Sequence, residues 1–233
     1  MAKRISKYDL EENFRDYLVS LWKQTVLLTN NFEYPEEDLS DATVVYVRHL
    51  NDLQIGIDEG PGVVEKMQRY KIKEQTSLRK NTLNYNKKYY KNERLIKIKS
   101  YCQGDMDVIF CSHYCDGARF LIPFTEGKFH YPTYTHVQKK QGNIIEEYMC
   151  SEAQIVYSRY EAEEGDRYRY ISINYAPRGT YPILGYETGI YEVTEGRVLY
   201  TKHKEYTWYG EFDAERKGLE FEDPQIDGIE RVV

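Results

Sequence analysis

The chain has 233 residues, of which 41% are hydrophobic, and its net charge is −6 at pH 7. This length fits one large domain, or one domain with a helical appendage, and the apolar share is enough for a core. No stretch approaches the roughly 18 consecutive apolar residues of a membrane-spanning helix, so we expect no membrane partner. Tyrosine is the outlier, with 24 residues, and it favours strands and half-exposed surfaces. The composition therefore predicts a mainly β fold.

The amino-terminal residues are basic and lack the apolar segment of a secretory signal, so we expect no such signal. In a chain of this length without a signal, cysteines are expected to be reduced thiols, and the expected location is cytoplasmic. The four cysteines are Cys102, Cys111, Cys115 and Cys150.

A helix is predicted over roughly residues 9–29, because apolar side chains fall on one stripe at helical spacing. Asp9 and Glu12 resemble a capping box at its start. We expect residues 1–31 to pack on the rest of the fold, and the alternative is a helix that dimerises or docks a partner. The stripe comprises Leu10, Phe14, Leu18, Leu21, Trp22 and Leu28.

An acidic linker at residues 33–41 follows, and after it the hydrophobic period changes to alternation. Residues 43–50 and 53–57 predict two strands joined by a tight turn. A glycine–proline break comes next, and residues 63–70 fit either a short helix or a strand.

Charge is segregated along the chain. Residues 66–99, the basic segment, contain twelve Lys and Arg against two acids, so the segment carries +10. Because the whole chain is −6, the other residues sum to −16. Within the basic segment we expect one strand across residues 71–79 and another near residues 95–101. A polar loop is expected between them, at residues 81–92.

From residue 102 onward, strand-like runs alternate with short turns that contain glycine. Strands joined this way, without helical patterns between them, predict an antiparallel meander. About ten or more strands suggest a barrel or a strongly curved sheet, because flat open sheets of that size are uncommon. We place this domain at residues 42–212 and expect an acidic, loosely ordered tail at residues 213–233. The connection at residues 176–189 fits either a binding loop or a plain link.

Cations with tyrosines between them suit a phosphate backbone or another polyanion. Our leading interpretation is a non-catalytic binding module for an anionic small ligand, a nucleic acid or an acidic protein surface. The plain alternative is a solvated lysine-rich face that the acidic linker and tail neutralise. The overall negative charge argues against a dedicated nucleic-acid binder, although local potential acts within a Debye length of about 8–10 Å. The candidate binding residues are Lys71, Lys73, Arg79, Lys80, Tyr85, Lys87, Lys88, Tyr89, Tyr90, Lys97, Lys99, Arg167 and Arg169.

Cys111, His113 and Cys115 alternate along a predicted strand, so their side chains point to one face. The first and third lie about 13 Å apart along a strand, too far to share one ion. We therefore predict no metal site and interpret the cysteines as small core residues. Zinc held with further ligands, or a reactive thiol aided by His113, is the alternative.

Asp116-Gly117-Ala118-Arg119 resembles part of the Lys-x-Asp-Gly-x-Arg motif of the covalent nucleotidyltransferases, which include nucleic-acid ligases and mRNA capping enzymes. In that family the lysine attacks a nucleoside triphosphate. Here Tyr114 occupies the place of the lysine, so the nucleophile is absent. The chemistry of a hairpin turn accounts for Asp-Gly equally well.

Two other classes of function are open at this level. An enzyme acting on a nucleotide or phosphate-bearing substrate inside the barrel would clamp phosphates with Arg and Lys and hold a metal with acids such as Asp116 or Glu187. A scaffold subunit would use the helix stripe and the basic segment as protein interfaces. No carboxylate pair stands out, because Glu146 and Glu147 are adjacent on a strand and face opposite sides. Neither a cofactor nor an oligomeric state is indicated.

Overall fold

The computed structural model describes residues 12–48, 60–125, 128–129, 134–176 and 183–207. These residues form one antiparallel sheet of 13 strands and two α-helices, α1 (Glu12–Asn31) and α2 (Pro61–Arg69). The mainly β prediction and the predicted amino-terminal helix are confirmed. The strands are β1 (Thr43–Arg48), β2 (Glu74–Gln75), β3 (Tyr85–Lys91), β4 (Arg94–Cys102), β5 (Asp105–Cys115), β6 (Ala118–Thr125), β7 (Lys128–Phe129), β8 (Thr135–Gln141), β9 (Ile144–Cys150), β10 (Ile155–Glu163), β11 (Arg167–Tyr175), β12 (Ile183–Thr194) and β13 (Arg197–Thr207).

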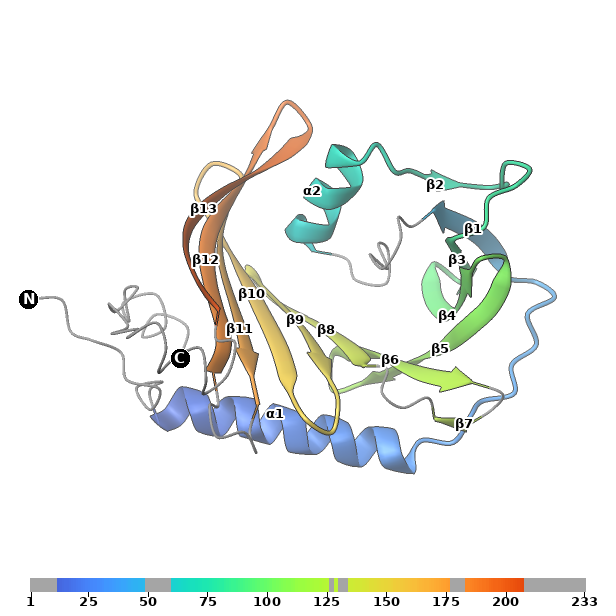
Figure 1. The fold of residues 1–233 in the computed structure, drawn as a ribbon, viewed down its shortest axis with the longest axis horizontal. Helices are drawn as coiled ribbons and strands as arrows, with labels where there is room; N and C mark the ends of the chain where they lie inside the picture. Colours follow the sequence, from blue (N-terminus) through green and yellow to red (C-terminus); the bar gives the residue numbers. More distant parts are fainter. Residues whose placement is uncertain (1–11, 49–59, 126–127, 130–133, 177–182, 208–233) are drawn as a thin grey trace, which may run out of the picture.

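The sheet is an antiparallel meander, as predicted. Its strand order is β13-β12-β11-β10-β9-β8-β6-β5-β4-β3-β1-β2, and β7 pairs with β6 beside this path. The sheet bends strongly into an open trough (Figure 1). It does not close into a barrel, so that half of the expectation is wrong and the strongly curved sheet is what forms.

Helix α2 gives a physical reason for the open sheet. It lies between the two ends of the sheet, near β13 on one side and β1 on the other (Figure 1). Val63 and Met67 of α2 pack against the buried cluster formed by Val47 of β1 and Ile72. On the other side, the Gln68 side chain bonds to the backbone of the β12–β13 turn and β13. The helix thus occupies the space across which the end strands would have to pair.

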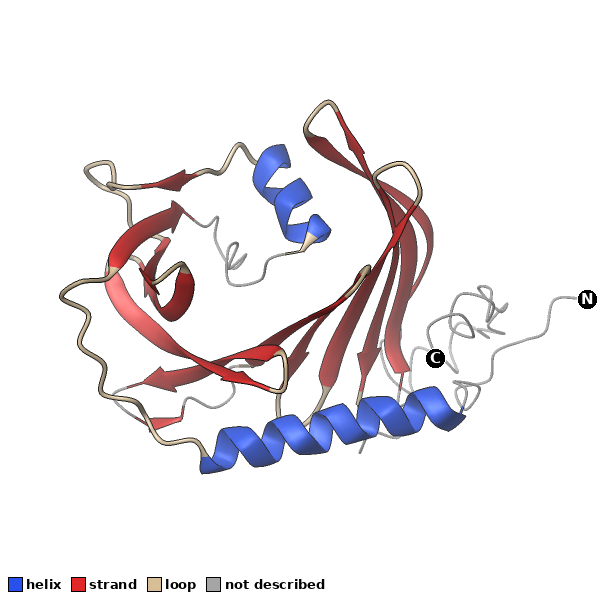
Figure 2. Cartoon of the chain, turned by 180° about the vertical axis from the view of Figure 1, so that it is seen from behind, coloured by secondary structure: helices blue, strands red, loops and turns tan. Residues whose placement is uncertain are grey.

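The two helices lie on opposite faces of the sheet, as Figure 2 shows from behind. Helix α1 runs across the outer, convex face, and α2 lies within the concave, inner face. Alternation along β9 makes the same point, because Glu146 accepts a hydrogen bond from Tyr17 of α1 while Glu147 lies against Gly60 at the start of α2. The expectation that this adjacent pair faces opposite sides is confirmed.

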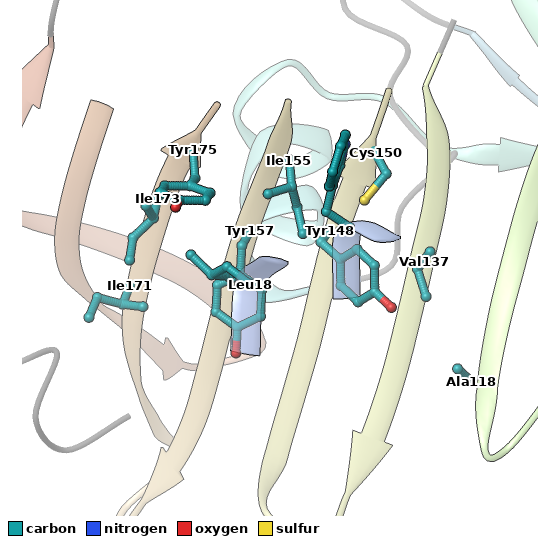
Figure 3. Packing of buried hydrophobic residues seen from close by; sticks show 11 residues of the cluster. Leu18, Ala118, Val137, Tyr148, Cys150, Ile155, Tyr157, Ile171, Ile173 and Tyr175 are labelled. Carbon is teal, nitrogen blue, oxygen red and sulfur yellow. The ribbon is translucent and has the colours of Figure 1, made fainter. Parts of the chain in front are cut away.

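The main core lies between α1 and the outer face of β6 and β8–β11. Figure 3 shows Leu18 of α1 beside Tyr157 and Ile173, all fully buried. Trp22 joins this cluster and donates its ring N–H to the Ser151 carbonyl at 2.8 Å. Burying apolar side chains of this size contributes about 1.5–3 kcal/mol each. The described part of the predicted stripe, with Leu18, Leu21, Trp22 and Leu28, is therefore the docking surface of α1. Leu10 and the Phe14 side chain lie outside the described part of the structure.

Two hydrogen bonds to one carboxylate help to orient α1 on the sheet. Tyr17 of α1 and Tyr157 of β10 both donate their hydroxyls to Oε1 of Glu146, each at 2.6 Å. Burial and the adjacent carboxylate raise the pKa of both tyrosines, so the hydroxyls stay protonated donors. Hydrogen bonds to a charged group are worth about 1.5–3 kcal/mol.

Five local expectations are corrected or resolved by the structure or fall outside the described residues. The polar loop expected at residues 81–92 is wrong, because β3 occupies most of it. Its lysines and tyrosines become strand residues because β1 and β4 pair with it on both sides. The strand expected across residues 71–79 shrinks to β2, and the ambiguous residues 63–70 are helical. The strand expected at residues 53–57 and the tail at residues 213–233 lie outside the described residues.

Candidate anion-binding site

The basic segment folds into the end of the sheet formed by β2, β1, β3 and β4. Strand register assigns its side chains to faces. Lys97 of β4 pairs with Cys111, which pairs with Ile122. Cys111 and Ile122 pack against Leu28 of α1, so Lys97 and its alternate neighbour Lys99 are on the outer face.

A hollow of about 160 Å³ opens at the edge of this outer face. Four cations line it, and no carboxylate does. The walls come from β1, from the segment between α2 and β2, and from the turn after β2. The lining residues are Tyr46, Arg48, Tyr70, Lys71, Ile72, Lys73, Gln75, Leu78, Arg79 and Thr82. We call this hollow the cationic pocket.

Strand alternation explains why the pocket lacks an acid. In β2, Gln75 pairs with Tyr46 on the outer face, so the adjacent Glu74 points to the inner face. There Glu74 accepts a hydrogen bond and ion pair from the buried Lys88 at 3.3 Å. The nearest carboxylate in the sequence is thus used on the opposite side of the sheet.

Helix α2 ends in a geometry that places Lys71 and Lys73 in the pocket. The N–H of Ile72 bonds to the Met67 carbonyl at 2.7 Å, and that of Lys71 to the Gln68 carbonyl at 3.1 Å. This pair of bonds is a Schellman motif, which requires a left-handed residue after the helix. Lys71 occupies that position with φ 54°, where glycine is the usual residue. A cation therefore stands where the backbone alone would favour a glycine.

The acidic linker neutralises some lysines of the outer face, and none of its described acids pairs with a cation of the pocket. Lys97, almost fully buried, lies 3.5 Å from Glu37 and 5.0 Å from the ring centre of Tyr34. Lys91 pairs with Asp41 at 2.5 Å. Within the described residues, no ion pair involves a cation of the pocket. The expected neutralisation by the linker therefore holds for part of the basic segment only.

Beside the cationic pocket, lysines and tyrosines alternate on the outer face of β1, β3 and β4. One row contains Tyr46, Lys87 and Lys99, and the next contains Arg48, Tyr85 and Tyr101. The Lys87 ammonium lies 5.0 Å from the ring centre of Tyr89, and interaction with that hydroxyl raises the pKa of Lys87. Lys87 therefore keeps its charge at neutral pH. We call this surface the tyrosine–lysine face.

The structure brings together only part of the predicted set. Lys71, Lys73 and Arg79 line the cationic pocket, and Tyr85, Lys87, Tyr89 and Lys99 belong to the tyrosine–lysine face. Lys80 is exposed on the turn but does not line the pocket, and Lys97 is paired with the linker.

Four other predicted residues lie away from this surface. Lys88 is buried toward the inner face and Tyr90 lines a different hollow. Arg167 and Arg169 stand on β11, eight places along the sheet from β1, and Arg169 is bonded to Glu163. They do not converge with the basic segment.

Sequence reasoning missed Tyr46 and Arg48. They precede the basic segment, so a count of charges along the chain did not include them. Alternation within the predicted strand at residues 43–50 does place both on one face, and that signal could have paired them with the basic segment.

Cys111, His113 and Cys115 do not converge with further metal-ligating side chains among the described residues. Cys111 is buried, and burial raises the pKa of its thiol to about 12. His113 packs against the Phe32 ring, with centres 5.0 Å apart. Among the described residues no group of three or more His, Cys, Asp or Glu side chains converges. All four cysteines are free.

Nor do the acids considered for an enzyme converge. Asp116 belongs to the β5–β6 turn, where it and Gly117 have φ of 50° and 74°, typical of a two-residue hairpin. Glu187 lies on β12 and accepts a hydrogen bond from Tyr200. Tyr114, at the lysine place of the nucleotidyltransferase motif, donates its hydroxyl to the Leu95 carbonyl at 2.9 Å.

Comparison with known proteins finds no matching family model, no similar curated protein and no similar solved structure. Among the described residues, no helix has both the length and the apolar character that crossing a membrane demands.

Proposed function

We propose that the protein is a non-catalytic binding module that takes an anionic ligand at the cationic pocket. One observation carries this proposal: four cations line one hollow that contains no carboxylate. Like charges held together repel, and an anion between them would remove that repulsion. The chain has 38 acids, so neutralising carboxylates were available in composition.

The size of the pocket suits a small anionic group. A volume of about 160 Å³ compares with about 30 Å³ for one water molecule in the liquid. One phosphate or two linked phosphates fit such a space. Arg48 and Arg79 can each offer a planar fork of donors to phosphate oxygens, and Lys71 and Lys73 add point charges. Tyr46 and Ile72 supply an apolar wall.

The pocket is on the surface, so its electrostatics must be discounted for solvent. Arg48, Lys71, Lys73 and Arg79 are all exposed. At 4 Å in bulk water, one pair of unit charges is worth about 1 kcal/mol. Four such contacts sum to about 4 kcal/mol, which corresponds to a Kd of about 1 mM, and salt weakens the binding.

Titration calorimetry with inorganic pyrophosphate tests the proposal. Replacing two pocket cations, as Lys73→Ala with Arg79→Ala, removes about 2 kcal/mol, which is roughly a 30-fold loss of affinity. Lys23→Ala with Lys139→Ala is the matched control, because it removes the same net charge from α1 and β8. Thermal unfolding of each variant checks that the fold is kept.

Two outcomes would overturn the proposal. The first is no heat of binding for the wild-type protein at low ionic strength with pyrophosphate in the millimolar range. The second is equal weakening by the pocket pair and by the control pair, which would show that overall charge, not the pocket, attracts the anion.

A further inference from the structure

Two groups of tyrosines among the described residues differ in what their hydroxyls do. In the core and on the inner face, Tyr157 and Tyr17 donate to Glu146, and Tyr200 donates to Glu187. Burial with a hydrogen-bonded hydroxyl is how a structural tyrosine is accommodated. Those rings therefore have a role within the fold.

Tyr46, Tyr85 and Tyr101 form the second group. They are half-buried and belong to none of the buried core clusters of the described residues. Within the part of the chain that the structure describes, their hydroxyls make no hydrogen bond. The rings contact one another: Tyr85 stacks on Tyr101 with centres 4.5 Å apart and 11° between planes, and Tyr46 lies 6.1 Å from Tyr85.

The group of three contacting rings is continuous with the cationic pocket. Tyr46 is a wall of the pocket and also contacts Tyr85. Lys87 lies 5.8 Å from the centre of the Tyr46 ring, and Lys99 lies 5.7 Å from that of Tyr89. Cations thus flank the rings on the same face. A ligand that places an anion in the pocket would have aromatic surface next to it, with further cations beside that surface.

We propose that the ligand is a single-stranded nucleic acid, with a phosphate in the cationic pocket and neighbouring bases on Tyr46, Tyr85 and Tyr101. This inference rests on the proposed function. Single-stranded nucleic acid alternates a phosphate with an aromatic base, and proteins that bind it combine a cationic track with stacking rings. A duplex keeps its bases stacked inside, so it cannot use the rings in this way. An acidic peptide would pair with the cations and leave the rings without a partner.

Fluorescence anisotropy with labelled 12-mers separates these ligands. The probes are oligothymidylate, an abasic sugar–phosphate strand of equal length, a 12-base-pair duplex and a polyglutamate peptide. At one fixed low ionic strength we expect oligothymidylate to bind at least about fivefold more tightly than the abasic strand, from one stacked base. The duplex and the peptide are expected to bind less tightly than oligothymidylate, because neither offers unstacked bases to the rings.

Two variants at one position assign the difference to the ring. Tyr85→Leu keeps an apolar strand residue and is expected to weaken oligothymidylate binding about 5- to 50-fold, with little change for the abasic strand or pyrophosphate. Tyr85→Phe keeps the ring and is expected to bind oligothymidylate as the wild type does. Circular dichroism melting of both variants shows whether they fold.

The outcomes distinguish this inference from the proposed function. Equal affinity for oligothymidylate and the abasic strand overturns the nucleic-acid inference and leaves the anion pocket in place. Binding of the duplex or of polyglutamate more tightly than oligothymidylate does the same. Equal loss in Tyr85→Leu and Tyr85→Phe also overturns it, because the hydroxyl, not the ring, would then matter. Failure of pyrophosphate to bind overturns the proposed function, and this inference with it.

Discussion

Replacing Lys71 by glycine should raise the stability of the fold and weaken anion binding at the same time. Lys71 has φ 54° at the left-handed position of the Schellman motif that ends α2. For a residue with a Cβ this conformation costs about 1–2 kcal/mol, and glycine avoids that cost. Glycine also has a more flexible unfolded chain, which offsets about 0.5–1 kcal/mol. The net expectation is that Lys71→Gly raises the free energy of unfolding by about 0.5–1 kcal/mol.

The same change removes one of the four cations of the pocket. A single charge at about 4 Å in water is worth about 1 kcal/mol, so affinity for pyrophosphate should fall about fivefold. The variant should therefore be more stable and bind more weakly. Such opposite effects are expected where a functional residue occupies a strained conformation.

Urea unfolding and pyrophosphate titration of Lys71→Gly and Lys71→Ala measure both effects. Alanine removes the same charge and keeps the cost of the left-handed backbone, so it should bind as weakly as glycine without gaining stability. The reasoning is refuted if Lys71→Gly unfolds at lower urea than wild type, because the lysine side chain would then support the fold. Unchanged pyrophosphate affinity in both variants would remove Lys71 from the site.

Three further predictions concern the fold that positions the site. Tyr157→Phe removes a 2.6 Å hydrogen bond to the Glu146 carboxylate and should lower the free energy of unfolding, measured in urea, by about 1.5–3 kcal/mol. An unchanged urea midpoint would mean that this hydrogen bond makes no net contribution to stability. Burial raises the pKa of Tyr148, Tyr157 and Tyr191. Because these tyrosines ionise above about pH 10 in the unfolded chain, the free energy of unfolding should be constant below that pH and fall above it by about 1.4 kcal/mol per pH unit for each tyrosine. A urea midpoint that does not change between about pH 9 and pH 11.5 would contradict this. Gly62→Ala places a Cβ 2.8 Å from the Tyr160 hydroxyl and 3.0 Å from the Tyr191 hydroxyl. It should therefore destabilise α2 by about 1–2 kcal/mol despite alanine's higher helix propensity, as hydrogen exchange at α2 would show.

Much of the fold follows from local pattern, because hairpins and an amphipathic helix are local structures. The stripe with Leu18 and Trp22 predicted α1, and Asp116-Gly117 predicted a turn whose positive φ angles the structure confirms. The position of β1 was not readable in this way. It lies between β2 and β3, so its partners come from 27 or more residues later in the chain. Pairing at that distance leaves no local signal.

For a related reason, the sequence could not show that the sheet stays open. Closure depends on what fills the trough, and α2 fills it because Gly60 and Gly62 let the helix backbone approach Glu147 and Tyr191 closely. In the sequence those glycines appeared only as a break. Part of the site could be predicted, since Lys71, Lys73 and Arg79 belong to a charge-rich segment. Arg48 could not be found by charge counting, because the sheet brings it to the pocket from outside that segment.

The net charge of the chain is therefore a poor guide to this surface. Alternation along β2 and β3 sends Glu74 and Lys88 together to the inner face, where they pair. The acidic linker pairs with Lys97 and Lys91. Both sets of ion pairs neutralise lysines next to the pocket and, among the described residues, none of the pocket's own cations. The positive charge of the pocket is therefore local. Because the Debye length in physiological salt is about 8 Å, an approaching anion responds to those cations and not to acids far along the chain. A chain with net charge −6 can thus present a site for a negatively charged ligand.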